Sequence, residues 1–279
     1  HRIARDENGN TSRAQAIVQS VAGLVDYHAD SIANHRPKSL VNRSGYHLHG
    51  LVANGEIDLA RLMVGSEGTL AMITDVTVAT VPQPAHRGCA LLLFDSVDRA
   101  AHAALELRAL DFSACDLMDR RHLSLARESD PRYELLIPVE AEAVLLVEFD
   151  GPTAAEVRDQ LNEAVELVQY RKQLAAGAIV ALDEGDYQLF WHLAQRFVPT
   201  LYRLKGSKRP VPCVEDIALP PEALPVFLRH LQDTLKRQQV TASLFGHVGH
   251  GQLHIRPFLD LAASDDVRRM EVLAGELYE

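Results

Sequence analysis

The sequence comprises 279 residues, enough for one large domain or two of ordinary size. Hydrophobic residues make up 47% and charged residues 24%, as in soluble globular proteins, which excludes a disordered or fibrous chain. Acidic residues number 38 and basic residues 28, for a net charge of −10, which opposes a large contact with nucleic acid or anionic lipid. The cysteines form no C-x-x-C pair, and no apolar run approaches the ~18 residues that cross a bilayer. We therefore expect a cytoplasmic protein without a transmembrane segment.

The first part of the chain is predicted to hold one amphipathic helix and one strand. Apolar residues recur at three- and four-residue steps from Thr11 to Asn34, behind a candidate cap at Thr11-Ser12. A glycine-punctuated turn at 65–70 precedes residues 73–81, which are rich in β-branched side chains and stopped by two prolines, as expected for a strand followed by a linker. The stretch 82–87 is the predicted domain boundary, which divides the chain into residues 1–84 and 85–279.

Beyond this boundary a strand followed by a helix is predicted three times. The strand at 89–94 precedes a helix that Ser96 caps and that ends near residue 110; the strand at 143–149 precedes a capping box at Thr153 and a helix that ends near residue 173. The third strand, 211–219, precedes two prolines and a helix with an apolar face. This order favours an α+β fold of the ferredoxin-like type, an antiparallel sheet with helices on one face. A parallel Rossmann sheet is the alternative.

The densest polar cluster is the segment 246–254, which contains three histidines and three glycines. If residues 248–251 form a four-residue hairpin loop, His247 lies opposite Gln252, and His254 lies diagonally on the same sheet face. Diagonal neighbours are ~7–8 Å apart, so one metal ion could bind between the two imidazoles. The alternative is that His247, His250 and His254 line a polar hairpin.

Three further groups of residues are candidates for ligand binding. Glu215-Asp216 interrupts an apolar strand, where a buried carboxylate needs a partner or a metal; the alternative is an edge strand with both acids in solvent. Arg196, Lys205, Lys208 and Arg209 surround this strand in the sequence and could pair with an anionic substrate; the alternative is a basic loop in solvent. The turn Gly65-Ser66-Glu67-Gly68-Thr69 offers backbone N–H groups and hydroxyls to an anion or cofactor, although a G-x-x-G pattern alone is weak.

Four motifs, in order, resemble the FAD-linked oxidases of the vanillyl-alcohol-oxidase type. They are Gly45-Tyr46, the segment 64–74 with the sequence VGSEGTLAMIT, the segment 214–220 with the sequence VEDIALP, and the segment 246–254 with the sequence GHVGHGQLH. Within that superfamily the likeness is to the D-lactate, glycolate and D-2-hydroxyglutarate dehydrogenases. It implies an FAD-binding domain that ends in residues 1–84, with a helical insertion, followed by a truncated substrate domain at 85–279.

The resemblance also implies roles for particular residues. Gly45, Tyr46, residues 65–69 and Ile73 would contact FAD, and His247 and His254, seven residues apart as in the family motif, would bind a divalent metal such as Zn, Fe or Mn. His250 and Gln252 stand where the motif has Asp and Asn, Ala194 stands where the family often has a substrate-binding Arg, and Val214 replaces a Lys. Arg196, Gln252 and Glu215 are then the remaining substrate candidates, and His250 joins the two metal ligands as a catalytic candidate.

The implied activity is FAD-dependent oxidation of a D-2-hydroxy acid by metal-assisted hydride transfer to flavin. A quinone, a cytochrome or an iron–sulfur domain would accept the electrons, which also suggests peripheral attachment to the inner face of a membrane. The family's glycine-rich pyrophosphate segment and its later E-H-G motif are absent from the sequence, so we expect a fragment of a longer chain that binds FAD and metal poorly alone. The alternative is a ferredoxin-like metal- or ligand-binding module without redox activity.

Overall fold

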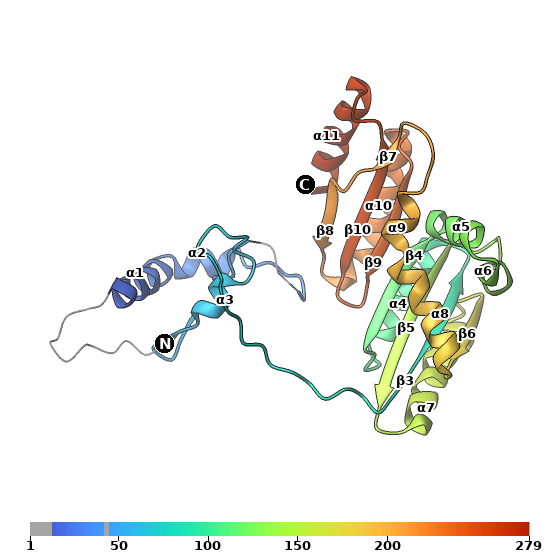
Figure 1. Ribbon diagram of the computed structural model, residues 1–279, viewed down its shortest axis with the longest axis horizontal. Helices are drawn as coiled ribbons and strands as arrows, with labels where there is room; N and C mark the ends of the chain where they lie inside the picture. The colour runs from blue at the N-terminus through green and yellow to red at the C-terminus, as the bar shows by residue number, and fades with distance from the viewer. Residues whose placement is uncertain (1–12, 42–44, 279) are drawn as a thin grey trace. The chain divides into compact units, whose positions relative to one another are not determined.

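The computed structural model describes residues 13–41 and 45–278, and the chain divides into two compact units, 1–81 and 82–279 (Figure 1). The division falls three residues before the boundary predicted after residue 84. The candidate cap at Thr11-Ser12 lies outside the described residues. No helix in the described ranges is both long and apolar enough to span a membrane.

The first unit contains short elements around a small apolar core. Its elements are α1 (Arg13–Tyr27), α2 (Ala29–Asn34), β1 (Val52–Ala53), β2 (Glu56–Ile57) and α3 (Leu59–Met63). The helix predicted over 11–34 is therefore two helices that meet at His28. Val18 of α1 packs with Leu51, Ile57 and Leu62 in the core of this unit.

The prediction of a strand at 73–81 is wrong. These residues have no regular secondary structure, and the large side chains Ile73, Val76 and Val78 are exposed. A β-branched sequence forms a strand only when its backbone pairs with a neighbour. No strand among the described residues pairs with this segment.

The second unit alternates strands and helices as the sequence predicted. Its first half contains β3 (His86–Phe94), α4 (Val97–Leu107), β4 (Ala114–Asp119), α5 (Arg120–Ser129), α6 (Pro131–Leu136), β5 (Ala143–Gly151), α7 (Ala154–Val165), a π-helix (Glu166–Arg171) and β6 (Gly177–Ala181). Its second half contains α8 (Glu184–Gln195), α9 (Phe197–Leu201), β7 (Arg209–Pro210), β8 (Val214–Ala218), a 3₁₀ helix (Pro221–Ala223), α10 (Leu224–Arg237), β9 (Ala242–His247), β10 (Gln252–Leu259) and α11 (Ser264–Tyr278). The strand predicted at 211–219 is shorter, since only 214–218 pairs there.

One sheet of eight strands organises this unit. The strand order is β6-β3-β5-β4-β9-β10-β7, β8 also pairs with β10, and every pairing between described residues is antiparallel. The first four strands interleave two strand–helix–strand units, which is the ferredoxin-like plan. The α+β class with an antiparallel sheet is therefore confirmed, and the parallel Rossmann alternative is wrong.

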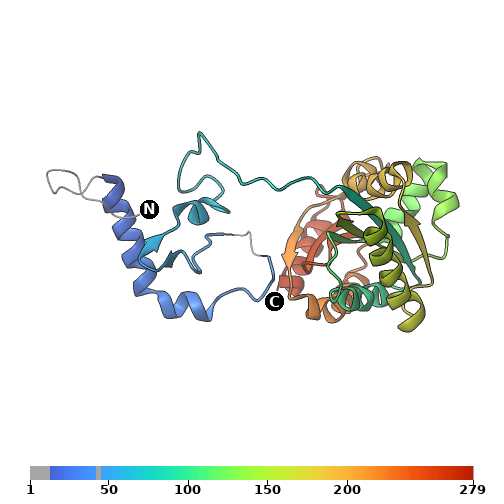
Figure 2. The same cartoon turned by 90° about the horizontal axis from the view of Figure 1, so that it is seen from below.

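Helices cover both faces of this sheet, so the prediction of helices on one face is wrong (Figures 1 and 2). Ala90 and Leu92 of β3 pack in a core with α4, α7, α10 and α11, whereas Cys89 and Leu91 pack in a second core with α5, α6 and α8. Alternate residues of a strand point to opposite faces, so β3 is buried on both. The unbroken apolar run at 89–94 is the pattern of such a strand.

Candidate functional site

The hairpin of β9 and β10 has the predicted register. His247 pairs with Gln252 across the loop at 248–251, so His247 and His254 lie on one sheet face. Their ring centres are 5.5 Å apart and the rings are perpendicular, with an interplanar angle of 89°. Gly251 closes the loop at a φ of +78°, where a Cβ atom would lie 2.1 Å from the carbonyl oxygen of Leu219. Only glycine fits this turn, which brings β10 back beside β9.

Each of the two histidines is bound to a carboxylate on another strand. His247 Nδ1 lies 2.8 Å from Asp116 Oδ1 of β4, and His254 Nδ1 lies 2.7 Å from Glu215 Oε2 of β8. A carboxylate has no proton to donate, so both imidazoles donate through Nδ1–H. This leaves the Nε2 atom of each neutral ring as the nitrogen with a lone pair.

Glu215 and Asp216 have different surroundings. Glu215 is largely buried and also pairs with Arg256, whose Nη2 atom is 2.6 Å from Glu215 Oε1. Asp216 is 68% exposed and accepts a hydrogen bond of 2.9 Å from Gln252 Nε2. One acid is thus partnered and the other solvated, and both lie on β8, an edge strand. Glu215, Asp216 and His254 each offer a ligand atom within 4.8 Å of one another.

A cavity of about 420 Å³ opens beside His254. Its lining includes Glu215, Asp216 and Arg256 from the sheet, and Gln195 and Val198 from α8 and α9. The volume falls in the range of small-molecule sites. The cavity therefore places a charged, partly polar surface next to one of the two histidines.

Four of the predicted site residues do not line this cavity: His247, Gln252, Arg196 and His250. His247 and Gln252 lie beside it, on the same sheet face as His254. Arg196 lies exposed where α8 ends and does not line it. Hydrogen bonds from Arg132 lower the pKa of Asp130 to about 2, and the charge of Arg196 contributes to the same shift, which places Arg196 near Asp130. His250 is exposed in the hairpin loop, where its backbone N–H donates to the carbonyl of His247.

The sequence did not single out three residues of this site. Asp116 and Arg256 are the charged partners described above, and Phe245 lies beside both imidazoles, with its ring centre 5.1 Å from that of His247 and 6.0 Å from that of His254. Asp116 interrupts the apolar strand β4 as Glu215 interrupts β8. The same signal, a carboxylate in an apolar strand, could have identified it.

Two buried titratable groups lie next to this site. Asp119, at the end of β4, accepts hydrogen bonds from Ser243 Oγ and the backbone N–H of Leu244 and of His122. Burial nevertheless raises the pKa of Asp119 to about 6. His122 of α5 is fully buried, and burial lowers its pKa to about 4. Asp119 thus ties β4 to β9, the strands that carry Asp116 and His247.

In the first unit, the predicted cofactor-binding segments meet through a hydrogen bond. Tyr46 Oη lies 2.8 Å from Thr69 Oγ1, and Thr69 Oγ1 donates to the carbonyl of Ser66 at 2.6 Å. The turn bends at Gly65, Glu67 and Gly68, and all three have positive φ, as has Gly45. Ile73 is exposed beyond the turn.

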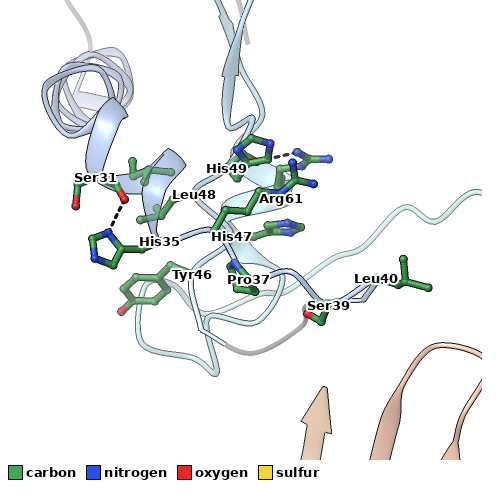
Figure 3. A pocket seen from close by; sticks show the side chains of 12 residues that line it. Ser31, His35, Pro37, Ser39, Leu40, Tyr46, His47, Leu48, His49 and Arg61 are labelled. Atoms are coloured by element: carbon green, nitrogen blue, oxygen red, sulfur yellow. Dashed lines mark hydrogen bonds between the residues drawn. The ribbon is translucent and has the colours of Figure 1, made fainter. Parts of the chain in front are cut away.

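A pocket of about 490 Å³ in the first unit includes Tyr46 (Figure 3). Arg36, Arg61 and three histidines line it, and no carboxylate of the described residues does. Arg61 donates from Nη1 to the carbonyl of His49 at 3.0 Å, which orders its guanidinium at the pocket. The lining favours an anionic ligand.

Fold and site together define an antiparallel α+β domain with a histidine pair on its central hairpin. Residues 83–279 match the family described as FAD linked oxidases, C-terminal domain, and the chain belongs to this family. The resemblance inferred from the motifs is confirmed.

Curated relatives are named for oxidoreductases of hydroxy acids. D-2-hydroxyglutarate dehydrogenase of Pantoea ananatis is 27% identical over 94% of this chain and 27% of its own length. The enzyme of that name from Escherichia coli K12 is 31% identical over 74% of this chain and 21% of its own length. Glycolate oxidase subunit GlcD of Bacillus subtilis is 29% identical over 80% of this chain and 46% of its own length. The chain thus spans between about a fifth and a half of these relatives.

Among solved structures, alkyldihydroxyacetonephosphate synthase shares the fold. It aligns with a TM-score of 0.54 at 16% identity, over 81% of this chain and 46% of that chain. At this identity the likeness concerns the fold alone.

Proposed function

We propose that this chain is part of an FAD-dependent dehydrogenase of a D-2-hydroxy acid, and that His247 and His254 hold a divalent metal beside the substrate. The observation that carries the proposal is the pair of imidazoles 5.5 Å apart on one sheet face, each bound through Nδ1 to a carboxylate. The family and the names of the relatives supply the chemistry, hydroxy-acid oxidation, in which such a site would serve.

The donor set fits a divalent cation. Two imidazoles on one tetrahedral ion, with metal–nitrogen bonds of about 2.1 Å, have ring centres about 5 Å apart, close to the separation found here. Neutral imidazole nitrogens suit Zn, Fe or Mn. A cation held there would supply a Lewis acid for the substrate oxygen. His250, which lies exposed in the loop between the two strands, is the proposed third ligand or proton acceptor when its side chain turns toward the pair.

The cavity beside His254 is the proposed substrate site. Its volume of about 420 Å³ exceeds that of a small hydroxy acid, and Arg256 gives it a positive charge, although Glu215 already pairs with that charge. Gln252 would contact the substrate from the same sheet face as His254. Arg196 remains a proposed contact only if its exposed side chain turns toward the cavity.

The first unit carries the proposed flavin contacts, at Gly45, Tyr46, residues 65–69 and Ile73. Of these residues Tyr46 lines the pocket of the first unit, where Arg36 and Arg61 suit an anionic cofactor and none of the described carboxylates takes part in the lining. FAD, when bound, supplies the acceptor for the substrate's hydride. The electrons would pass on to a quinone, a cytochrome or an iron–sulfur domain.

The test is turnover of D-2-hydroxyglutarate, glycolate and D-lactate with an artificial electron acceptor, in the complete protein that contains this chain. We expect a flavin spectrum and turnover of one of these acids, and we expect His247→Ala to abolish turnover while the flavin spectrum persists. His102→Ala, an exposed histidine of α4, is the control. A complete protein without flavin would refute the oxidoreductase and leave the metal- or ligand-binding module.

A further inference from the structure

We propose that Asp116 is a positioning residue for His247: it holds the imidazole with its proton on Nδ1, so that Nε2 carries the lone pair with which a ring binds a cation. The inference rests on the proposed metal site and assigns a function to a residue on another strand. Asp116 does not itself bind the cation in this arrangement.

The first argument is the burial of the Asp116 carboxylate. Asp116 is 4% exposed, and His247 is the only basic side chain of the described residues within ion-pair distance of it. Burial of a carboxylate is costly unless a positive charge or hydrogen bonds compensate it. A cation on Nε2 of His247 would supply that charge through the ring. The carboxylate therefore favours both the ligand tautomer and the cation.

The second argument is the rigidity of the pair. Asp116 and His247 are opposite residues of the β4–β9 ladder, and Asp116 is also paired with Leu146 of β5 on its other side. The backbone N–H of Gly249 donates to the carbonyl of Cys115, which ties the hairpin loop to the same strand. A movement of the hairpin loop therefore does not separate the side chains of Asp116 and His247. Such fixed outer partners orient metal-binding histidines in proteins.

Comparison with the second histidine shows why Asp116 should matter more. Glu215 also accepts from a histidine, but Arg256 lies 2.6 Å from its other oxygen and compensates its charge. Asp116 has no such arginine or lysine in the described part of the chain. Removal of its charge should therefore weaken cation binding, and this effect does not depend on direct ligation.

A different placement of the cation makes an opposite prediction. Glu215, Asp216 and His254 could hold an ion among themselves, because their ligand atoms lie within 4.8 Å of one another. In that case Asp216 would be a ligand, and Asp116, on the far side of His247, would have no influence.

The experiment combines zinc titration with imidazole ¹⁵N NMR on the complete protein that contains this chain, as the parent, and on its variants. In Asp116→Asn the amide can donate to Nδ1 and shift the proton of His247 to Nε2. We expect protonated Nδ1 in the metal-free parent, a shift of that proton to Nε2 in the variant, and zinc affinity lower by about 10- to 100-fold. Asp150→Asn, on the exposed part of β5, is the control and should bind zinc as the parent does. Asp216→Asn tests the other placement of the cation, and it should retain zinc binding if the two histidines hold the ion.

The outcomes distinguish the proposed role of Asp116 from the proposed metal site. Unchanged zinc affinity and an unchanged tautomer in Asp116→Asn would overturn the role of Asp116 while the metal site stands. Loss of zinc binding in Asp216→Asn alone would place the ion among Glu215, Asp216 and His254, and it would also overturn the proposed role of Asp116. If the parent binds no zinc, the proposed metal site fails, and the tautomer in Asp116→Asn still decides whether Asp116 orients the ring.

Discussion

His122 should make the stability of the second unit depend on pH. Its ring is fully buried between α5 and α8, and Nε2 donates to the carbonyl of Leu193 at 2.8 Å. Nδ1 is buried without a hydrogen-bond partner, so a second proton there would have no acceptor. Burial accordingly lowers the pKa of His122 from 6.5 to about 4.

Because the pKa of His122 is lowered in the folded chain, the stability of the second unit falls on acidification. Above pH 6.5 the ring is neutral in both the folded and the unfolded chain, and its contribution to stability is fully present. As the pH falls from 6.5 toward 4, the unfolded chain binds a proton that the folded chain does not, and stability is lost. The shift corresponds to about 3 kcal/mol in all, of which about 2 kcal/mol is lost between pH 7.5 and pH 5.

The assay is urea unfolding of the parent and of His122→Leu at both pH values. The variant loses the hydrogen bond to Leu193, so it should be less stable at pH 7.5. Its free energy of unfolding should, however, fall by about 2 kcal/mol less than that of the parent on acidification. The comparison cancels the contribution of Asp119, which both chains retain. His192→Leu, which removes an exposed imidazole from α8, is the matched control. Equal pH dependence in the parent and in His122→Leu would refute the reasoning.

Three further predictions concern the same unit. The side-chain carboxyl of Asp119 should titrate in ¹³C NMR with a midpoint near 6, and its contribution to stability should fall as the pH rises through that value; a midpoint near 3.8 would contradict the effect of burial. Gly251→Ala should cost about 3 kcal/mol or more in urea unfolding, because the new Cβ would meet the carbonyl of Leu219, whereas Gly275→Ala, with open space in α11, should gain ~0.5–1 kcal/mol. Ser96→Ala should cost about 1 kcal/mol, since Ser96 Oγ accepts from Arg99 N–H at the start of α4, and an unchanged unfolding midpoint would show that the cap contributes nothing.

Local sequence signals predicted most of the second unit. Ser96 and Thr153 accept backbone hydrogen bonds at the starts of α4 and α7, as their positions indicated. These signals act over three or four residues, so they can be read without knowledge of the fold. The strand–helix–strand order then limits the topology to a few choices, of which the ferredoxin-like one is observed.

The errors arose where an element depends on distant residues. The apolar run at 89–94 indicated a buried strand, but which helices cover its two faces is decided by packing of α5, α6 and α8 across the sheet. Residues 73–81 have the composition of a strand, yet strand formation also needs a pairing partner. Composition alone does not supply that information.

The site shows the same division between local and distant information. The hairpin register was predictable because a four-residue loop fixes which residues face each other, and His247 and His254 follow from it. Their partners were not, since Asp116 is 131 residues from His247 and Glu215 is 39 residues from His254. Only the folded sheet brings these strands together.

This division bears on how a histidine pair can be interpreted. A polar hairpin could carry two histidines at this spacing without any ligand, and the spacing alone does not distinguish the two cases. The buried carboxylate of Asp116 does, because its burial costs free energy unless the ring of His247 carries a second proton or a cation, whereas Arg256 already compensates the charge of Glu215. His250 and Gln252, which stand where the family motif has Asp and Asn, leave both carboxylate contacts in place, since neither side chain takes part in them. The capacity to bind a cation should therefore follow Asp116 and Glu215 more closely than it follows the residues of the loop.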